Sequence, residues 1–376
     1  MNFPVFLQIH TLHSYTAALL NRDDTGQAKR LIYGDISRTR ISSQCLKRHW
    51  RMAENDPKAL QKLHGYVDSL RSRELVTEKV IKPLRGMFSD EVVNALEPDF
   101  QKLVYGDKAD KGKKSRQTLI LGAPELNWLA VRAQEIASDA DGDAEVAKKA
   151  VASWVKDKNF KAMQENATLP AGLVSALFGR MVTSDPAANI EAPVYVAHAF
   201  TVHAAETEGD YFTAVDDLKS DDDDSGADTI QETEISSGLF YGYVVLDLAG
   251  LISNLGEDRN LAARVVGHLV HLIAEVSPGA KRGSTAPFGR ADLMMIEAGN
   301  RQPRSLATAF RKPIPHDAEK AITALSDELT RFDETYATGE ERAYLSMRGQ
   351  IEGVERKNLN ELADWASDRV SQVSDA

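Results

Sequence analysis

Hydrophobic residues occupy alternate positions in several short segments of the chain. At the start, Val5, Leu7 and Ile9 alternate with neighbours that include Gln8 and His10. This two-residue period is typical of a β-strand with one buried face. The same reasoning predicts further strands at residues 31–33, 194–203, 239–248 and 293–297.

The middle of the chain, from about 56 to 192, shows helical spacing of its apolar residues instead. The best helix candidates there are 89–104, 124–138, 143–158 and 171–180. Later helices are expected at 261–276, 316–337 and 358–373. Strands on both sides of a helical block predict one α+β sheet domain that carries an insertion. A repeated strand–helix–strand order would make that sheet ferredoxin-like.

The segment from Arg38 to Arg51 predicts a helix with two unlike faces, beginning near Ser42 and Ser43. Leu46 and Trp50 suit a core. The polar face is formed by residues at i, i+3, i+4 and i+7, namely Gln44, Lys47, Arg48 and Arg51. A helix start offers N–H groups to an anion, and a cationic stripe extends that offer over several phosphates. The segment therefore predicts phosphodiester binding, although a solvated helix face would have the same pattern.

Charge is distributed unevenly along these 376 residues. The net charge is −11, yet residues 1–52 carry +5 and residues 206–234 carry −11. An acidic total therefore does not exclude a nucleic-acid partner. The length allows two or three lobes at roughly 150 residues per domain.

Other features narrow the class of protein. The single cysteine, Cys45, excludes an internal disulfide and a cysteine-based zinc site. No apolar run approaches the length of a membrane span, and the first residues lack the features of a signal peptide. A cytoplasmic protein with no membrane association is expected.

Metal and catalytic chemistry receive little support from the sequence. Asp221–Asp224 begins a run that formally fits a calcium loop, but flanking helices are not evident, so an acidic surface tip is preferred. His268, His271 and Glu275 share a helix face and are interpreted as core or interface residues. No hydrolase motif is present. No metal and no cofactor are predicted.

Several separated strings resemble the CasC family, the backbone subunit of type I-E CRISPR Cascade complexes. In order, these strings occupy residues 20–24, 40–48, 179–184, 196–203, 211–218, 235–241 and 278–282. The family usually has Ser where this chain has Cys45. The resemblance implies an α+β fold with a modified RRM-like (ferredoxin-like) palm, a large helical fingers insertion and a β-hairpin thumb. The expected division is palm 1–55, fingers 56–192, a palm strand at 193–203, thumb 204–236, and palm with C-terminal helices 237–376.

The resemblance also implies a function and a set of partners. The chain would be a non-catalytic subunit that binds CRISPR RNA (crRNA), oligomerises along it and presents it to target DNA in antiviral defence. Its partners would be crRNA, other copies of itself, other Cascade subunits and target DNA. The alternative is a guided ribonuclease like the type III backbone subunits, using an aspartate of the first palm loop, Asp23 or Asp24. A freestanding RNA-binding protein is the third possibility.

Candidate RNA-binding residues follow from the resemblance together with the basic helix. They are Asn21, Arg22, Lys29, Arg40, Ser42, Ser43, Gln44, Lys47, Arg48, Arg51, Met181, Tyr211, Phe212, Thr213, Lys281 and Arg282. Met181 matches a methionine that wedges against bases, whereas without the resemblance it would be assigned to a core. Lys281 and Arg282 lie in a glycine-bounded loop that lacks Walker spacing. Candidate DNA contacts in the fingers are Lys113, Lys114, Lys148 and Lys149, for which a solvated surface is an equal alternative.

Overall fold

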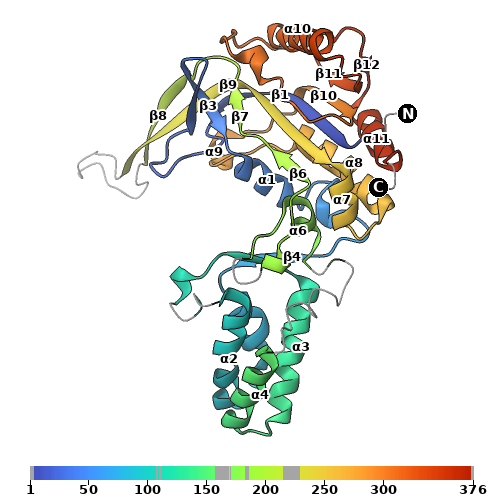
Figure 1. The fold of residues 1–376 in the computed structure, drawn as a ribbon. Coiled ribbons are helices and arrows are strands. Elements are labelled where there is room, and N and C mark those ends of the chain that lie inside the picture. Colours follow the sequence, from blue (N-terminus) through green and yellow to red (C-terminus); the bar gives the residue numbers. More distant parts are fainter. Residues whose placement is uncertain are drawn as a thin grey trace, which may run out of the picture. The chain divides into compact units, whose positions relative to one another are not determined.

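A computed structural model gives the fold of the chain (Figure 1). It describes residues 4–106, 109, 112–156, 169, 171–182, 186–214 and 229–373. The chain forms two compact units. The palm unit comprises Met1–Leu60, Val196–Leu246 and Ala263–Ala376, and the insertion unit comprises Gln61–Tyr195 and Asp247–Ala262. The sequence division placed 247–262 with the palm, whereas here this segment packs with the insertion.

The palm unit is built on one large sheet. Its strands are β1 (Phe6–Ala18), β2 (Arg30–Tyr33), β3 (Ile36–Ile41), β7 (Ala199–Thr201), β8 (Thr207–Ala214), β9 (Thr229–Asp247), β10 (Ala291–Gly299), β11 (Glu341–Ser346) and β12 (Glu355–Arg356). The strand order is β12-β11-β10-β1-β9-β7-β3-β2, with β8 paired to β9. A short strand, β6 (Val194–Val196), spans the boundary between the units.

The order of elements along the palm gives the ferredoxin-like arrangement. Helix α1 (Ser43–Arg51) follows β1 and the β2–β3 hairpin, and α8 (Arg259–Glu275) lies between β9 and β10. The four central strands, β10-β1-β9-β7, thus come from two strand–helix–strand passages. The remaining palm helices are α9 (Arg282–Thr285), α10 (Ala318–Tyr336) and α11 (Leu359–Ser371). The predicted fold class, α+β with this palm, a helical insertion and a β-hairpin, is confirmed.

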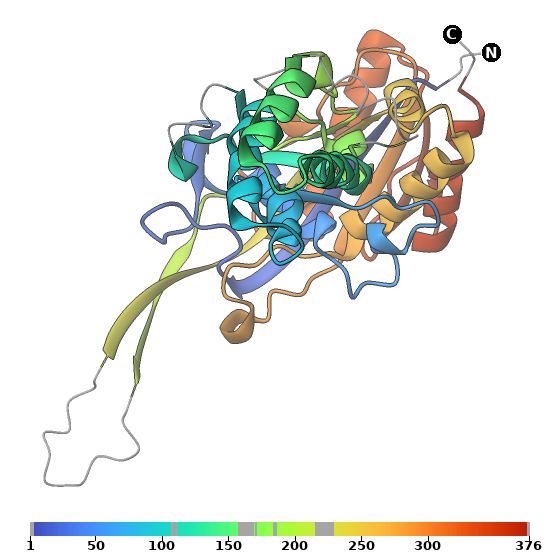
Figure 2. The same cartoon turned by 90° about the horizontal axis from the view of Figure 1, so that it is seen from below.

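Strands β8 and β9 form the hairpin, which extends beyond the rest of the palm unit (Figure 2). Antiparallel pairing runs from Thr207 opposite Ser236 to Ala214 opposite Thr229. Strand β9 continues from the hairpin into the central sheet, so the arm and the sheet share one strand. The acidic run Asp221–Asp224 lies outside the described residues.

The insertion unit is mainly helical. Its elements include β4 (Ser69–Ser72), β5 (Leu119–Gly122), α2 (Asp90–Tyr105), α3 (Ala123–Asp139), α4 (Ala144–Lys156), α6 (Leu173–Phe178), α7 (Leu248–Asn254) and a π-helical turn, η2 (Val76–Ile81). Trp154 packs on Phe100 and on Trp128, with ring centroids 5.3 and 5.4 Å apart. The core therefore joins α2, α3 and α4, as aromatic side chains with large buried areas allow.

A buried ion pair fixes the backbone next to Met181 in the insertion unit. Nη1 of Arg180 donates to both carboxylate oxygens of Glu125 at 2.7 Å, and Arg180 Nε donates to the Ala188 carbonyl at 3.1 Å. Glu125 also accepts from the Gly122 N–H at 2.9 Å, which closes the start of α3. Because a buried pair is costly to leave half-satisfied, this contact holds the segment in one conformation.

Within the described ranges, every helix is too short or too polar to cross a lipid bilayer.

Candidate nucleic-acid interface

Helix α1 is held at its start by the loop that precedes the first hairpin. Ser42 is the N-cap, and its Oγ accepts from the Cys45 N–H at 3.3 Å. The Ser42 N–H donates to Oδ1 of Asn21 at 2.8 Å. Asn21 therefore has a structural partner within the protein as well as its predicted RNA contact. The start of a helix also presents N–H groups that have no intrahelical partner, which suits an anion.

The two faces of α1 are arranged much as the spacing predicts. Trp50 is 3% exposed, and Leu46 packs against a cluster of buried side chains that includes Ile41. Gln44 and Arg48 are exposed, while Lys47 is half-buried. The last turn is basic, so Arg48 and Arg51 also complement the negative end of the helix dipole.

Three cations from three separate segments act electrostatically on Cys45. Burial raises the pKa of its thiol to about 11, against the opposing influence of Lys29, Arg48 and Arg282. These cations belong respectively to the first palm loop, to α1 and to α9. We call this group, together with Lys47 and Arg51 of α1, the cationic surface.

His49 links α1 to the loop that carries Lys281. Its Nδ1 donates to the Cys45 carbonyl at 2.8 Å, so its Nε2 accepts from the Gly279 N–H at 3.3 Å. This pair of bonds requires a neutral ring. Burial, a positive charge on Arg282 and one on Arg48 all lower the pKa of His49. The histidine that joins α1 to this loop, beside the cationic surface, is therefore uncharged.

Lys281 and Arg282 are positioned by further backbone contacts. The Ala280 N–H donates to the Leu19 carbonyl at 2.8 Å, which ties the loop to the end of β1. Lys281 Nζ donates to Thr233 Oγ1 and lies 5.1 Å from the centre of the Phe212 ring. Lys281 is therefore engaged with the hairpin, while Arg282 is exposed.

The first palm loop is fastened by two acids. Oδ1 of Asp23 accepts from the N–H groups of Thr25 and Gln27 at 2.9 and 3.0 Å. Its bond with the Thr25 hydroxyl is the main cause that lowers the pKa of Asp23. Glu234 of the hairpin accepts from the Ala28 N–H at 2.7 Å and pairs with Arg30.

Arg22 of this loop is exposed, and Lys29 is half-buried. Arg40 donates from Nη1 to Nδ1 of His198 at 2.9 Å and from Nε to the Arg30 carbonyl at 3.0 Å. Burial lowers the pKa of His198, as do the positive charges of Arg40 and Lys29. His198 is a neighbour of this surface to which the sequence reasoning gave no role.

Arg38 shows that the charge of residues 1–52 overstates the accessible charge. Its side chain is fully buried, and its guanidinium donates to the carbonyls of Tyr33, Thr201 and Phe310 at 2.8 to 3.2 Å. The arginine therefore joins β3 to its neighbours and is sequestered from any ligand.

Three candidate RNA-binding residues, Tyr211, Phe212 and Thr213, lie in β8 of the hairpin. Tyr211 and Phe212 are exposed. Thr213 lies in β8 opposite Ile230. Phe212 contacts Lys281, the neighbour in sequence of Arg282 of the cationic surface.

The other candidates belong to the insertion unit. Met181 is 66% exposed, contrary to its assignment to a core on composition alone. Its carbonyl accepts from Gln117 Nε2 at 3.0 Å. Lys113 pairs with Glu74 at 2.6 Å. The side chains of Lys114, Lys148 and Lys149 are exposed.

The histidines of α8 are engaged in local contacts. His268 Nδ1 lies 2.8 Å from the Lys58 carbonyl, and His271 Nδ1 lies 3.3 Å from Glu275 Oε2. In the part of the chain that the structure describes, no three His, Cys, Asp or Glu side chains gather as metal ligands would.

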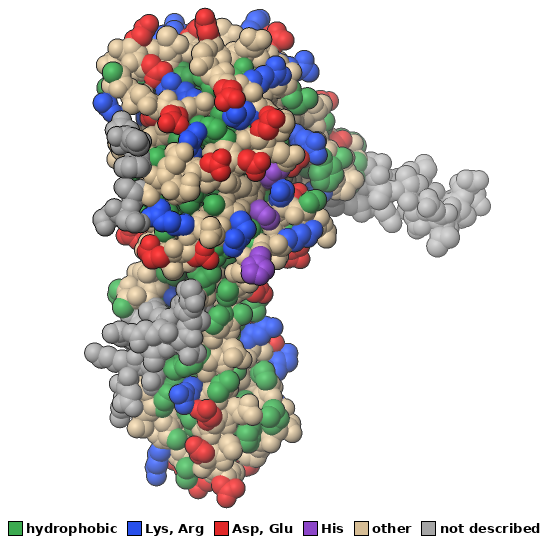
Figure 3. Space-filling model, turned by 90° about the vertical axis from the view of Figure 1, so that its right-hand side faces the viewer, with side chains coloured by type: hydrophobic (Ala, Val, Ile, Leu, Met, Phe, Trp, Pro, Cys, Tyr) green, Lys and Arg blue, Asp and Glu red, His purple; other side chains and the backbone are tan. Residues whose placement is uncertain are grey.

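The cationic surface is a local feature. On the face shown in Figure 3, blue and red side chains are interspersed over the palm unit. A local gathering of cations from distant segments is therefore more informative than the net charge of −11.

The fold and this surface define a class: α+β proteins with a ferredoxin-like palm, a helical insertion, a β-hairpin arm and a cationic palm surface. The family model described as CT1975-like protein matches residues 7–368. The chain belongs to the CT1975-like protein family.

Two solved structures extend this comparison. A chain titled "CRISPR RNA-guided surveillance complex, pre-nicking" is 26% identical, with a TM-score of 0.78, covering 97% of this chain and 100% of that one. A second, titled "CRISPR RNA-guided surveillance complex", is 22% identical with a TM-score of 0.60, covering 96% and 98%, and supports the fold alone. No curated protein sequence matches the chain.

Proposed function

We propose that this protein is a crRNA-binding backbone subunit of a CRISPR surveillance complex of the type I-E Cascade kind. One observation carries the proposal: hydrogen bonds join two other cation-bearing segments to α1, the loop of Lys29 through Asn21 and the loop of Arg282 through Gly279. A surface of this kind binds phosphates without reading sequence. The similarity over 97% of the chain to a subunit of an RNA-guided surveillance complex supports the same role.

In this proposal the protein holds the RNA backbone and leaves sequence recognition to base pairing. Phosphates lie along the exposed face of α1 beside Gln44, and at the helix start that the buried Ser42 and Ser43 form. Tyr211, Phe212 and Met181 contact bases. Copies of the chain assemble along one guide in the cytoplasm, with other Cascade subunits as neighbours and target DNA as ligand.

A non-catalytic role is part of the proposal. The ribonuclease alternative needs an aspartate of the first palm loop. Oδ1 of Asp23 instead accepts bonds from its own loop, which supports a structural role for that oxygen. Metal-dependent cleavage of a complementary RNA at regular intervals would overturn this part.

The RNA that accompanies the protein tests the proposal. The chain is co-expressed with its neighbouring Cascade subunits and a CRISPR array, purified, and its nucleic acid is sequenced. We expect a uniform RNA of one spacer with repeat flanks, lost in the double variant Lys47→Glu and Arg51→Glu. The matched control is Lys320→Glu with Arg331→Glu on α10, which alters two exposed cations elsewhere on the palm unit and should retain the RNA. Protein free of RNA, or a random RNA mixture, would contradict the assignment.

Contact with target DNA is proposed for exposed lysines of the insertion unit. Lys148 and Lys149 lie on α4, and both side chains are exposed. Charge reversal at both positions is expected to weaken binding of target DNA severalfold while leaving the amount of bound guide unchanged, because each lost phosphate contact reduces electrostatic affinity. Electrophoretic mobility shifts with the purified complex measure this effect. Equal loss of guide and DNA would assign these lysines to a different role.

A further inference from the structure

The loop from Ser277 to Arg290 is closed at its base. Ser277 Oγ donates to the Gly289 carbonyl at 2.8 Å and accepts from the Gly289 N–H at 2.9 Å. Inside the loop, the Lys281 carbonyl accepts from the N–H of Thr285 at 3.1 Å and from its hydroxyl at 2.8 Å. With the Gly279 contact to His49, these bonds hold the loop against α1 of the cationic surface.

Phe288 stands out in this loop because the residue is 75% exposed. Its neighbours in sequence are fixed: Pro287 is buried, and a Cβ added to Gly289 would lie 2.8 Å from the Ser14 carbonyl oxygen. The Phe288 N–H also donates to the Ala286 carbonyl at 2.7 Å, where Ala286 has a φ of +40°. The backbone thus holds the ring outward.

The loop that carries this ring also carries an exposed cation and small exposed residues. Arg282, Gly283 and Ser284 are exposed. A Cβ on Gly279 would lie 3.2 Å from Arg282 Cγ and 2.6 Å from Pro287 Cγ, so the arginine stem and the proline before Phe288 cover the same glycine. Arg282 and Phe288 are therefore presented by one small, hydrogen-bonded loop.

This combination fits a nucleotide better than a protein partner. Protein interfaces are marked by contiguous apolar patches, whereas Phe288 is one ring in a charged and polar setting. A nucleotide has a flat base that stacks on an aromatic side chain and a phosphate that pairs with a neighbouring cation. The adjacent hairpin repeats the pattern, since Lys281 lies over the exposed ring of Phe212.

We propose that Phe288 is a base-stacking residue that receives one nucleobase of the bound single-stranded RNA while Arg282 holds an adjoining phosphate. This inference rests on the proposed function. It adds an aromatic contact from the 277–290 loop, independent of the hairpin and of Met181.

The test compares the RNA affinities of Phe288→Ala, Phe288→Leu and Phe288→Trp. Each variant is titrated into single-stranded RNA that contains 2-aminopurine, and fluorescence anisotropy measures binding at two salt concentrations. Phe288→Ala is expected to weaken binding roughly 5- to 150-fold, the effect of losing one stacked base. The salt slope should stay unchanged, because the ring releases no counterions. Phe288→Trp should retain affinity and fluorescence quenching, and Phe288→Leu should lose both.

The control is Ile32→Ala, which removes another exposed apolar side chain, 80% exposed, from β2 of the same unit. It should leave RNA binding unchanged. If wild-type protein binds RNA and Phe288→Ala binds as tightly, the stacking role is wrong and the proposed function stands. If Phe288→Ala instead reduces self-association in sedimentation without altering RNA affinity, the ring contacts protein. If the wild type binds no RNA, both proposals fail.

Discussion

Replacing Lys29, Arg48 and Arg282 together by alanine is expected to reduce the salt dependence of RNA binding by about two units of log–log slope. Each phosphate contact with a single strand contributes about 0.7 to that slope. Between 50 and 200 mM salt, the variant should therefore lose about 20-fold less affinity than the wild-type protein. Anisotropy titrations with a single-stranded RNA at four salt concentrations measure both values.

The stability of the triple variant should change little. Arg48 and Arg282 are exposed and Lys29 is half-buried. Burial shifts the pKa of His49 and of Cys45 more than these cations do. The control removes Lys320 and Arg331 of α10, two exposed cations that pair with Asp317 and Glu328. Such pairs contribute about 0–1 kcal/mol. A triple variant with an unchanged slope would place the RNA elsewhere on the protein.

Local sequence patterns predicted the elements of this surface but not how they meet. The i, i+3, i+4, i+7 spacing gives the polar face of α1 because helical periodicity is a property of neighbouring residues. The contact between His49 and Gly279 joins positions 230 residues apart, and no local pattern reports it. The role of Glu234 in fastening the first loop is hidden for the same reason.

At particular positions, charge and hydropathy patterns predicted the accessible charge and the strands incorrectly. Arg38 counts as a cation in the sequence, yet four backbone carbonyls satisfy it in the interior. Strand β3 was not predicted, although Gly34 and Asp35, with φ of +64° and +63°, form the tight turn that joins it to β2. A Cβ on Gly34 would lie 1.7 Å from the Arg311 carbonyl oxygen, so the turn depends on tertiary packing that the sequence does not display.

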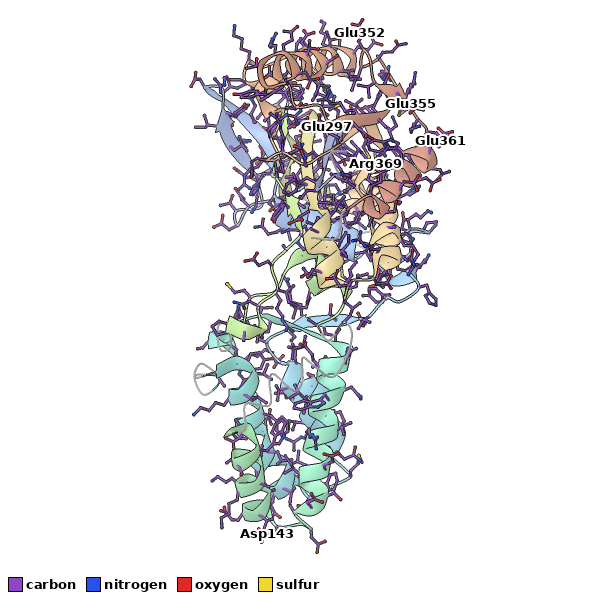
Figure 4. All side chains as sticks on the ribbon, turned by 45° about the vertical axis from the view of Figure 1, so that its right-hand side comes forward. Asp143, Glu297, Glu352, Glu355, Glu361 and Arg369 are labelled. Atoms are coloured by element: carbon purple, nitrogen blue, oxygen red, sulfur yellow. The ribbon has the colours of Figure 1, made fainter. Side chains whose placement is uncertain are left out.

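A buried ionic cluster in the palm carries the second large expected effect. Glu297 of β10 is fully buried, and Figure 4 shows it within the palm, well separated from Glu352 and Glu355. Its Oε1 accepts from His10 Nε2 at 2.9 Å and from Arg304 Nη1 at 2.7 Å. Its Oε2 accepts from Arg304 Nη2 at 2.8 Å and from Arg342 Nε at 2.7 Å. One carboxylate thus joins β1, β10, β11 and the segment before α10.

Glu297→Ala is expected to lower the free energy of unfolding of the palm by about 3–5 kcal/mol, because it leaves Arg304 and Arg342 with only one of the two buried acids that they share, Glu340. Urea unfolding followed by circular dichroism measures the loss. The control is Glu355→Ala on β12, whose exposed carboxylate pairs with Lys357 at 2.7 Å and should cost about 0–1 kcal/mol. Equal costs for the two variants would mean that the cluster does not stabilise the palm.

Acid should reduce the difference in the free energy of unfolding between the wild-type protein and Glu297→Ala. Burial alone would raise the pKa of Glu297, but hydrogen bonds from His10 and Arg304 outweigh it and hold the pKa far below its ordinary value of 4.5. A depressed pKa gives stability that is present above the unfolded value and is lost as pH falls through the folded value. Burial lowers the pKa of His10 below its ordinary value of 6.5, so His10 also resists protonation in the folded palm. The cost of Glu297→Ala should therefore be full near pH 7 and shrink below about pH 4.5, whereas a cost independent of pH would assign it to lost packing instead.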